Sequence, residues 1–484
     1  MDERYITSVD LGSSKIAVAV ARVEGDNVQM IYYKETPSDG VRHSHVFNPQ
    51  KVSAPLKKAI EDAEKDLGIK ILQAVVGLPR WYVRQEIATA KLERTNPEES
   101  VSTEEVSVLK SEAVDSYPLD DESKEVIYGA VAQSFSVEDY YQTSEDDIVG
   151  MVSPVIEGNF KAFIGSKRSS TNIDMVFNNV GVAIADRIFT PDAVAKAVLT
   201  PEEMENGVAL IEFGAGVTSV TIYHGGIMRH YGAIPFGGDS VTGDIKVECG
   251  ISTALAENIK LAYGACMPDR LASMSEKILQ ISYEESAMEK QLPVKYLSEI
   301  ITSREMEIVN SMLYEIEMSG YADDLRSGVV ITGGGANIAN CGNLIKSMSG
   351  YTVREGYPQH LFTSTGCQGI AETDATVSVG MILAAKEDQY LNCTKDAPVR
   401  IVAEAAVEPE VEPEVEPEAE PERQAPAETL FSDAEMGPKV KPKKTQKVRP
   451  PKPQKTQKER VFWTKLKKGV IGHIDSLYEG MEDD

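Results

Sequence analysis

Short apolar runs alternate with stretches of helical period over about the first 398 residues of the chain. The runs Ile6–Asp10, Ile16–Ala21 and Gln29–Tyr33 predict three successive strands, because each has the length and apolar content of a strand that packs on a core. Between Pro49 and Leu67 the apolar residues recur at helical spacing, and Ala74–Val76 predicts a further short strand. This alternation favours an α/β fold.

The same pattern begins again near residue 207. Val208–Ile211, Val217–Tyr223 and Ile227–Ala233 predict three more strands. In both copies a glycine-rich turn joins the first two strands: Asp10–Ser14 in the first copy and Glu212–Gly216 in the second. The chain is therefore predicted to contain two related lobes that arose by internal duplication.

Residues 85–165 interrupt the first copy. They begin as an acidic segment that we expect to be poor in strands, and they continue with two strand-like runs, Val126–Val137 and Phe160–Gly165. We interpret them as an inserted subdomain. Lobe 1 is then formed by residues 1–84 and 166–206, and lobe 2 by residues 207–398.

The composition changes abruptly after Thr394. Glu408–Glu422 repeats the pattern Glu-Pro-Glu-Val/Ala, and such a segment cannot bury a core. Lys439–Lys458 carries nine Lys and Arg residues and no acidic residue. Residues 399–458 are therefore predicted to be a disordered linker that is first acidic and then basic.

The last segment, residues 459–484, predicts an amphipathic helix. At 100° per residue its large apolar side chains share one face, and lysines lie on the opposite side and at the flank. We expect such a helix to lie in the headgroup region of a membrane, with the basic stretch attracted to anionic lipid. Docking on a protein partner, and nucleic-acid binding by Lys439–Lys468, are the alternatives. The residues expected to bind the membrane are Phe462, Trp463, Leu466, Lys467, Lys468, Val470, Ile474 and Leu477.

Composition narrows the range of partners. The chain has 484 residues and a formal net charge of −27, which argues against nucleic acid as its main partner because the phosphates would repel it. Five cysteines without metal-ligand spacing indicate a reduced, cytoplasmic setting. We expect no signal peptide and no membrane-spanning helix, so membrane contact would be interfacial.

The two glycine-rich turns are the best candidates for binding chemistry. Backbone N–H groups in tight turns bind phosphates, since glycine lets the backbone come close. Asp10 would end a strand and hold a magnesium ion through water. Either turn alone could be an ordinary hairpin, but two related copies predict a phosphate clamp. The clamp residues would be Gly12, Ser13, Ser14 and Lys15 in the first turn and Gly214, Ala215, Gly216 and Val217 in the second.

A third glycine-rich segment supports this interpretation. Gly328–Asn337 begins as an apolar strand and runs into Gly333, Gly334 and Gly335. A surface without side chains could accept an adenine ring, and a helix is expected to start after it. The three segments together predict an ATP site between two lobes.

These motifs resemble the phosphate 1, phosphate 2 and adenosine motifs of the superfamily of actin, Hsp70 and sugar kinases. Within it, the chain is similar to the FtsA family of bacterial cell-division proteins. Gly207–Ile245 resembles that family's second phosphate motif and its continuation, Ala256–Gly264 the helix that contacts the nucleoside, and Ala375–Gly380 the closing helix. The inserted residues 85–165 and the terminal helix narrow the resemblance to FtsA.

The resemblance implies an α/β fold of duplicated ribonuclease-H-like lobes. Lobe 1 would be subdomain 1A, and residues 85–165 would be subdomain 1C, which is used in self-assembly. Lobe 2 would be subdomain 2A, with subdomain 2B at about residues 245–325.

The resemblance also implies further nucleotide contacts. Glu257 and Lys260 would face the ribose and adenine, although a solvated helix pair without a ligand is the alternative. Gly237, Gly238 and Asp239 would lie beside the phosphates.

The second phosphate motif departs from the family pattern. Glu212 stands where Asp is usual, Ala215 replaces the usual second glycine, and Ser219 replaces an acidic residue. Asp10 and Glu212 remain the expected magnesium ligands, through water. Because these changes alter how magnesium and the attacking water are held, we expect ATP binding with slow hydrolysis or none, and we assign no catalytic residue.

The function that the resemblance implies is that of a membrane-tethered adaptor in cell division. ATP would bind between the lobes and promote assembly into protofilaments. Subdomain 2B would bind the C-terminal peptide of FtsZ, the tubulin-like division protein. The terminal helix would hold FtsZ filaments at the cytoplasmic face of the inner membrane at the division septum, together with other division proteins.

Three other functions remain open on the same fold. A sugar or metabolite kinase would need an aspartate base, and Asp239 and Asp244 are available. A pilus-assembly or rod-shape actin homologue is the second alternative, and pilus-type relatives lack the terminal amphipathic helix. An Hsp70-like chaperone would need a β domain, which residues 387–458 are not expected to form.

Overall fold

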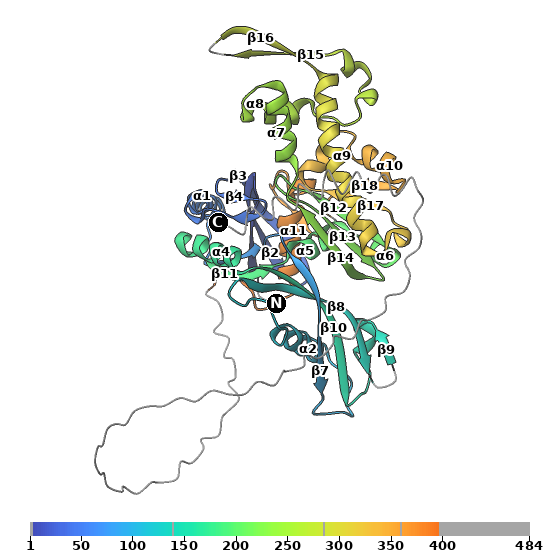
Figure 1. The fold of residues 1–484 in the computed structure, drawn as a ribbon. Coiled ribbons are helices and arrows are strands. Elements are labelled where there is room, and N and C mark those ends of the chain that lie inside the picture. The colour runs from blue at the N-terminus through green and yellow to red at the C-terminus, as the bar shows by residue number, and fades with distance from the viewer. Residues whose placement is uncertain (1–2, 138–139, 284–285, 359–360, 396–484) are drawn as a thin grey trace, which may run out of the picture. The chain divides into compact units, whose positions relative to one another are not determined.

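The computed structural model describes residues 3–137, 140–283, 286–358 and 361–395 (Figure 1). The predictions for the linker at 399–458 and for the amphipathic helix at 459–484 lie outside the described residues. Within the described part of the chain, the structure contains no helix that combines the length and the apolar character needed to cross a bilayer.

A six-stranded sheet forms the centre of lobe 1. Its strands are β1 (Arg4–Leu11), β2 (Lys15–Glu24), β3 (Asn27–Pro37), β6 (Gln73–Gly77), β11 (Ala183–Ile188) and β19 (Thr363–Ser364). They lie in the order β11-β6-β1-β2-β3-β19, with β1, β2 and β3 antiparallel to one another and β6 and β11 parallel to β1. The predicted strands are confirmed, and each extends beyond the predicted run.

Lobe 2 has a five-stranded sheet of the same topology. Its strands are β12 (Val208–Phe213), β13 (Thr218–His224), β14 (Ile227–Ile234), β17 (Val329–Thr332) and β18 (Val353–Glu355). The order β14-β13-β12-β17-β18 and the strand directions repeat those of β3-β2-β1-β6-β11 in lobe 1. The internal duplication inferred from the sequence is therefore confirmed.

Helices bury the strands of both sheets, which explains why the central strands are nearly continuous apolar runs. In lobe 1, α1 (Pro49–Leu67) packs against α4 (Lys167–Val180), and α5 (Thr190–Val198) packs against α11 (Thr376–Ala385). The predicted lobe boundary therefore differs from the structure, because β19 and α11, from the residues assigned to lobe 2, complete the core of lobe 1. The predicted helix at Pro49–Leu67 is confirmed. Lobe 2 carries α6 (Pro201–Asn206), α7 (Gly238–Cys249), α8 (Thr253–Tyr263), α9 (Val294–Ser319) and α10 (Cys341–Ser349).

Beyond α7 and α8, lobe 2 carries a two-stranded sheet of β15 (Ile278–Tyr283) and β16 (Ser286–Pro293), which leads into α9. The cysteines at 249 and 266 are buried in the hydrophobic core of this lobe, as small core residues are.

The inserted residues form a separate four-stranded sheet, visible at the lower end of Figure 1. It has the order β7-β10-β8-β9, and α2 packs on it. The expectation that this segment begins without a strand is wrong, since β7 starts at Arg84. Only every second residue in the middle of β7 is buried, so no apolar run marks it. The elements are β7 (Arg84–Glu93), α2 (Thr103–Asp115), β8 (Glu125–Val137), β9 (Tyr140–Thr143), α3 (Glu145–Ile148) and β10 (Val155–Ser166).

Arg94 is the main polar anchor of this inserted subdomain. Its guanidinium group is buried and donates to both carboxylate oxygens of Glu105, at 2.8 and 3.0 Å. It also donates to the main-chain oxygens of Glu99, Ser100 and Ser153. The bond to Arg94 lowers the pKa of the Glu105 carboxyl.

We expect the substitution Arg94→Ala to lower the free energy of unfolding of the inserted subdomain by about 3–5 kcal/mol. The carboxylate and the main-chain oxygens that the buried Arg94 guanidinium group binds would then lack a partner. Hydrogen exchange of β7 and α2, together with urea unfolding, measures the effect. Lys91→Ala is the matched control. Its contact with Glu157 at 3.8 Å is exposed and should contribute less than about 1 kcal/mol. Equal effects of the two substitutions would contradict the prediction.

The inserted subdomain contacts the main chain of β14, the edge strand of the lobe 2 sheet. Gln85 accepts a hydrogen bond from the N–H of Tyr231 at 2.9 Å and donates to its carbonyl oxygen. Gln133 donates to the carbonyl oxygen of Met228 at 2.9 Å, and Lys161 donates to that of Arg229. Side chains from three inserted strands thus satisfy main-chain groups along this edge.

Glu305 of α9 is an acid in the core of lobe 2. It is 1% exposed, and its Oε2 atom has no hydrogen-bond partner among the described residues. Burial raises the pKa of this carboxyl to about 7, and Lys260 opposes the shift. The folded protein therefore holds the proton more tightly than the unfolded chain does.

This raised pKa predicts a pH dependence of stability. The stabilisation that comes from the protonated Glu305 carboxyl is fully present below its unfolded pKa near 4.5. It is lost as the pH rises through the folded pKa of about 7, which lowers the free energy of unfolding by on the order of 3 kcal/mol. We expect Glu305→Gln to remove most of this loss. Urea unfolding at pH 5 and pH 8 measures it, with Glu299→Gln, on an exposed position of the same helix, as control. An unchanged pH dependence in Glu305→Gln would refute the assignment.

Candidate functional site

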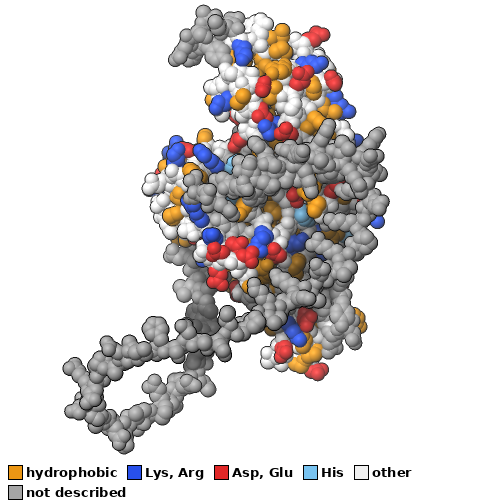
Figure 2. All heavy atoms as spheres, in the orientation of Figure 1, with side chains coloured by type: hydrophobic (Ala, Val, Ile, Leu, Met, Phe, Trp, Pro, Cys, Tyr) orange, Lys and Arg blue, Asp and Glu red, His pale blue; other side chains and the backbone are white. Residues whose placement is uncertain are grey.

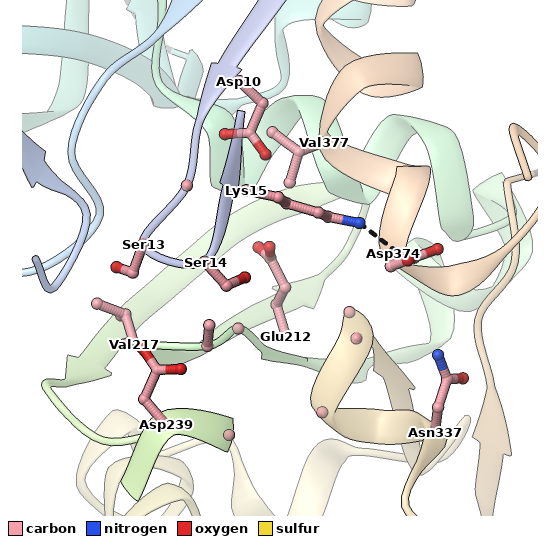
Figure 3. A pocket seen from close by; sticks show the side chains of 18 of the residues that line it. Asp10, Ser13, Ser14, Lys15, Glu212, Val217, Asp239, Asn337, Asp374 and Val377 are labelled. Carbon is pink, nitrogen blue, oxygen red and sulfur yellow. Dashed lines mark hydrogen bonds and ion pairs between the residues drawn. The ribbon is translucent and has the colours of Figure 1, made fainter. Parts of the chain in front are cut away.

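The glycine-rich turns of both lobes line one cavity of about 430 Å³, a volume typical of small-molecule sites (Figure 3). The turn between β1 and β2 contributes Gly12–Lys15, and the turn between β12 and β13 contributes Gly214–Val217. The segment after β17 contributes Gly333–Gly335. The duplication brings the first two turns together, and the parallel pairing of β17 with β12 brings in the third.

The two hairpin turns have the same hydrogen bonding. Gly12 N–H donates to the carbonyl oxygen of Lys15 at 3.0 Å, and Gly214 N–H donates to that of Val217 at 2.9 Å. The turns also touch each other. A Cβ atom added at Gly216 would lie 2.6 Å from the hydroxyl of Ser13, so this position requires glycine.

The third segment packs closely on the second turn. Gly333 has φ of +87°, and a Cβ atom there would lie 2.5 Å from the carbonyl oxygen of Phe213. Its N–H donates to the carbonyl oxygen of Thr373 at 3.1 Å. A short 3-10 helix, η4 (Gly334–Asn337), follows, and the α-helix expected after the glycines begins at Cys341.

All the predicted nucleotide-binding residues line this cavity except Gly237. Gly237 instead lies behind the second turn, where a Cβ atom would meet the carbonyl oxygen of Gly214 at 2.3 Å. The next two residues continue this packing. Gly238 N–H donates to Gly214 and Asp239 N–H donates to Ala215, at 3.0 and 2.9 Å. Gly237 thus packs against the second turn and supports its conformation without lining the cavity.

Glu257 and Lys260 lie together on α8. The ammonium group of Lys260 is 2.8 Å from the Glu257 carboxylate and donates to the carbonyl oxygen of Gly238 at 3.1 Å. Glu257 also accepts from the hydroxyl of Thr242. The Lys260 side chain is 9% exposed and that of Glu257 is 38% exposed, so the glutamate of this pair is the more open to solvent.

The Lys15 side chain reaches two acidic residues of the cavity that the sequence did not indicate. Its ammonium group is 2.8 Å from the Asp374 carboxylate, as Figure 3 shows, and it also pairs with Glu35. Burial alone would lower the pKa of Lys15, but the bonds to Asp374 and Glu35 outweigh it and raise the pKa. Lys15 therefore stays charged. Asp374 lies just before α11. The resemblance to the family's closing helix begins at the next residue, and this resemblance is the sequence feature that could have pointed to Asp374.

A small hairpin of β4 (Val41–Arg42) and β5 (His45–Val46) joins the two phosphate turns. Its tip residues have positive φ, +46° for His43 and +63° for Ser44. His43 Nδ1 lies 2.9 Å from the carbonyl oxygen of Gly216, and Ser44 N–H donates to the hydroxyl of Ser13 at 3.3 Å. The sequence analysis missed this hairpin because its strands are two residues long.

Arg80 is a further residue of the cavity that the sequence did not indicate. It follows β6, and its guanidinium group forms a buried ion pair with Glu212, whose side chain is 6% exposed. Its backbone N–H donates to the hydroxyl of Ser44 at 2.9 Å, and its carbonyl oxygen accepts from the hydroxyl of Tyr231. An arginine after a Leu-Pro pair carries no motif that the sequence alone would reveal.

The residues expected to hold magnesium do not fit that ion well. Glu212 is already engaged by Arg80, so its carboxylate is not free to bind a hydrated cation. Burial raises the pKa of Asp10, with Arg80 and Lys15 opposing the shift, which disfavours the anionic form that a magnesium ligand needs. Among the described residues, no group of three or more His, Cys, Asp and Glu side chains could hold a metal ion.

The two aspartates that a kinase could use as a base differ in their surroundings. Asp244 is paired with Arg304 at 2.6 and 3.0 Å, so this aspartate is already occupied. Asp239 lines the cavity, and burial raises its pKa, with Lys260 opposing the shift. The cavity thus offers main-chain donors and cations to a polyphosphate, and Asp239 is the one of these two aspartates that lines it.

Comparison with known proteins agrees with this geometry. Residues 209–380 match the family described as cell division protein FtsA. The FtsA of Pseudomonas aeruginosa is 28% identical over 360 residues, covering 73% of this chain and 83% of the relative. That of Bacillus subtilis is 26% identical over 447 residues, covering 92% of this chain and 98% of the relative.

A solved structure of the PilM–PilN type IV pilus biogenesis complex shares the fold, with a TM-score of 0.56 and 13% identity over 78% of this chain and 98% of that chain. The duplicated lobes thus have the actin-like fold predicted from the sequence. The family match over residues 209–380 and the relatives at 26–28% identity, which extend over most of the chain, make it similar to the FtsA cell division proteins.

Proposed function

We propose that this chain is an ATP-binding, actin-like division protein that links FtsZ filaments to the cytoplasmic face of the inner membrane at the division septum. The observation that carries the proposal is the convergence of three glycine-rich turns on one cavity. The main-chain N–H groups and the cations of that cavity suit a triphosphate, and its volume suits a nucleotide.

ATP would act as a structural ligand in this proposal. It would lie between turns of both lobes and so favour one arrangement of the lobes. Self-association into protofilaments would follow from that arrangement. The pairing of Glu212 with Arg80 leaves no free carboxylate at that position to orient a water molecule, which supports slow turnover or none.

The FtsZ peptide would bind at residues 245–325, subdomain 2B in this proposal. Large apolar side chains are exposed there: Val247 is 74% and Ile278 is 51% exposed. Figure 2 shows hydrophobic side chains among charged ones at the upper end of the molecule, where Figure 1 places α7, α8 and α9. Exposed apolar groups rimmed by charges are typical of a surface that binds a peptide.

Membrane attachment would come from the C-terminal segment. Its support is the sequence pattern described above, an apolar face at 459–484 preceded by a basic stretch. The same membrane would bring the chain together with other division proteins.

Titration of the full-length chain with ATP, followed by pelleting with and without ATP and by binding of an FtsZ C-terminal peptide, tests the proposal. We expect saturable ATP binding, more pelleting with ATP, and capture of the peptide. Absence of saturable binding to any adenine nucleotide would overturn it. Peptide capture also separates this function from that of a pilus-assembly homologue, and phosphorylation of an added sugar would instead indicate a kinase.

A further inference from the structure

Three cationic side chains of the described residues line the cavity: Lys15, Arg80 and Lys260. Lys15 lies on the first phosphate turn, and Lys260 lies on α8, where it donates to the carbonyl oxygen of Gly238. Arg80 lies at the second phosphate turn. A Cβ atom added at Gly214 would be 3.4 Å from its Nη2 atom. The guanidinium group is therefore within reach of a phosphate that this turn binds.

The backbone of Arg80 is fixed between the β4–β5 hairpin and β14. Its N–H is held by Ser44, whose own N–H bonds to Ser13 of the first turn. Its carbonyl oxygen is held by Tyr231 from β14. These bonds set where the side chain begins, while the guanidinium group extends between Glu212 and the second turn.

The acidic side chains near Arg80 are of the kind that usually bind a metal ion. Glu212 is the penultimate residue of β12, as Asp10 is of β1, and Arg80 pairs with Glu212. A cation of the protein itself is thus bound at one of the two positions expected to hold magnesium. A guanidinium group has five donors in a rigid fork, so it can keep one carboxylate and still bind a phosphate with its remaining N–H groups.

We propose that Arg80 binds the terminal phosphate of the nucleotide and supplies there the positive charge that a magnesium ion would otherwise supply. The inference rests on the proposed nucleotide site. Two consequences follow. The affinity for ATP should depend little on magnesium, and Arg80 should favour the triphosphate over the diphosphate, because the diphosphate lacks the group that it contacts.

The test is titration of the full-length chain with ATP and with ADP, each in magnesium and in EDTA. For the unmodified chain we expect removal of magnesium to change the ATP dissociation constant by less than about threefold. The informative variant is the pair Arg80→Gln with Glu212→Gln, which removes both charges and so leaves no buried ion unpaired. In EDTA its ATP affinity should fall about tenfold or more, and its ADP affinity less than about threefold.

Glu212→Gln alone is the matched control, since it keeps the arginine and frees it from its partner. Because the freed guanidinium group can turn all of its N–H groups to the phosphate, the ATP affinity of this variant in EDTA should rise above that of the unmodified chain. Thermal unfolding of each variant checks that the fold is retained, and Arg80→Lys, which keeps the charge without the fork, should recover part of the affinity.

The outcomes separate this inference from the proposed function. If the unmodified chain binds neither nucleotide, the proposed function itself fails. If it binds ATP only with magnesium, or if the double variant loses ATP and ADP affinity equally, nucleotide binding stands and the role of Arg80 is overturned.

Discussion

Replacing Gly334 with leucine should abolish nucleotide binding and leave the fold intact. Gly334 begins η4 and lines the cavity. A Cβ atom there would meet one described atom within 4 Å, Cβ of Asp374 at the ordinary distance of 3.7 Å. The protein itself can therefore accept the side chain, which would occupy the space proposed for the adenine ring. We expect the ATP dissociation constant to rise at least about 100-fold, equivalent to about 2.8 kcal/mol.

Gly243→Leu is the matched control for this substitution. Gly243 lies in α7, has no atom within 4 Å of an added Cβ, and does not line the cavity. Leucine there should leave ATP affinity unchanged and stabilise the helix by up to about 1 kcal/mol. Unchanged affinity in Gly334→Leu, with the protein folded, would contradict the proposed position of the nucleotide. Isothermal titration and thermal unfolding provide both readouts.

The second large effect is expected at the C-terminal segment. Changing Trp463 and Leu466 together to glutamate should reduce vesicle binding at least about 100-fold, because burying each large apolar side chain is worth about 1.5–3 kcal/mol and each new charge opposes insertion. Co-sedimentation of the full-length chain with anionic vesicles measures it.

The control for that experiment changes charge and leaves the apolar face unaltered. Lys465→Glu together with Lys468→Glu should weaken binding by about 1 kcal/mol per lysine, on anionic vesicles and at low salt only. If the two double variants lost binding equally, attraction by charge alone would explain the attachment, and the amphipathic helix would not be required. Retained binding by the first variant would contradict the proposed membrane face.

Most of the fold could be predicted because the central strands are buried on both faces. The run Ile16–Ala21 is fully buried, so its apolar residues are consecutive and visible in the sequence. β7 could not be found in the same way. Ala88 and Ala90 are buried, but small residues alternating with polar ones give little signal. Sequence patterns report burial, and β7 packs one face on a small separate core.

The candidate site could be predicted where glycine is required. It could not be predicted where charged residues far apart in the sequence form an ion pair. The glycine turns recur in the sequence, since the close contacts of Gly216 and Gly333 exclude other residues. Arg80 and Glu212 are 132 residues apart, and only the packing of the two lobes brings them together. A single arginine has no periodicity, so the local sequence does not indicate its partner.

That pairing also changes how the departure at Glu212 is understood. From the sequence, a longer carboxylate at this position suggested altered magnesium binding. In the structure the extra methylene carries the carboxylate to an arginine that the family pattern did not suggest. The substitution and Arg80 are best understood together.

The contacts along β14 have a consequence for how copies of the chain can associate. An exposed sheet edge is a template on which another chain can add a strand, which leads to uncontrolled aggregation. Here Gln85, Gln133 and Lys161 occupy main-chain groups of β14. That edge is thus closed to strand exchange, so a second copy that met this side of lobe 2 would have to contact side-chain surfaces, whose geometry can be specific and reversible.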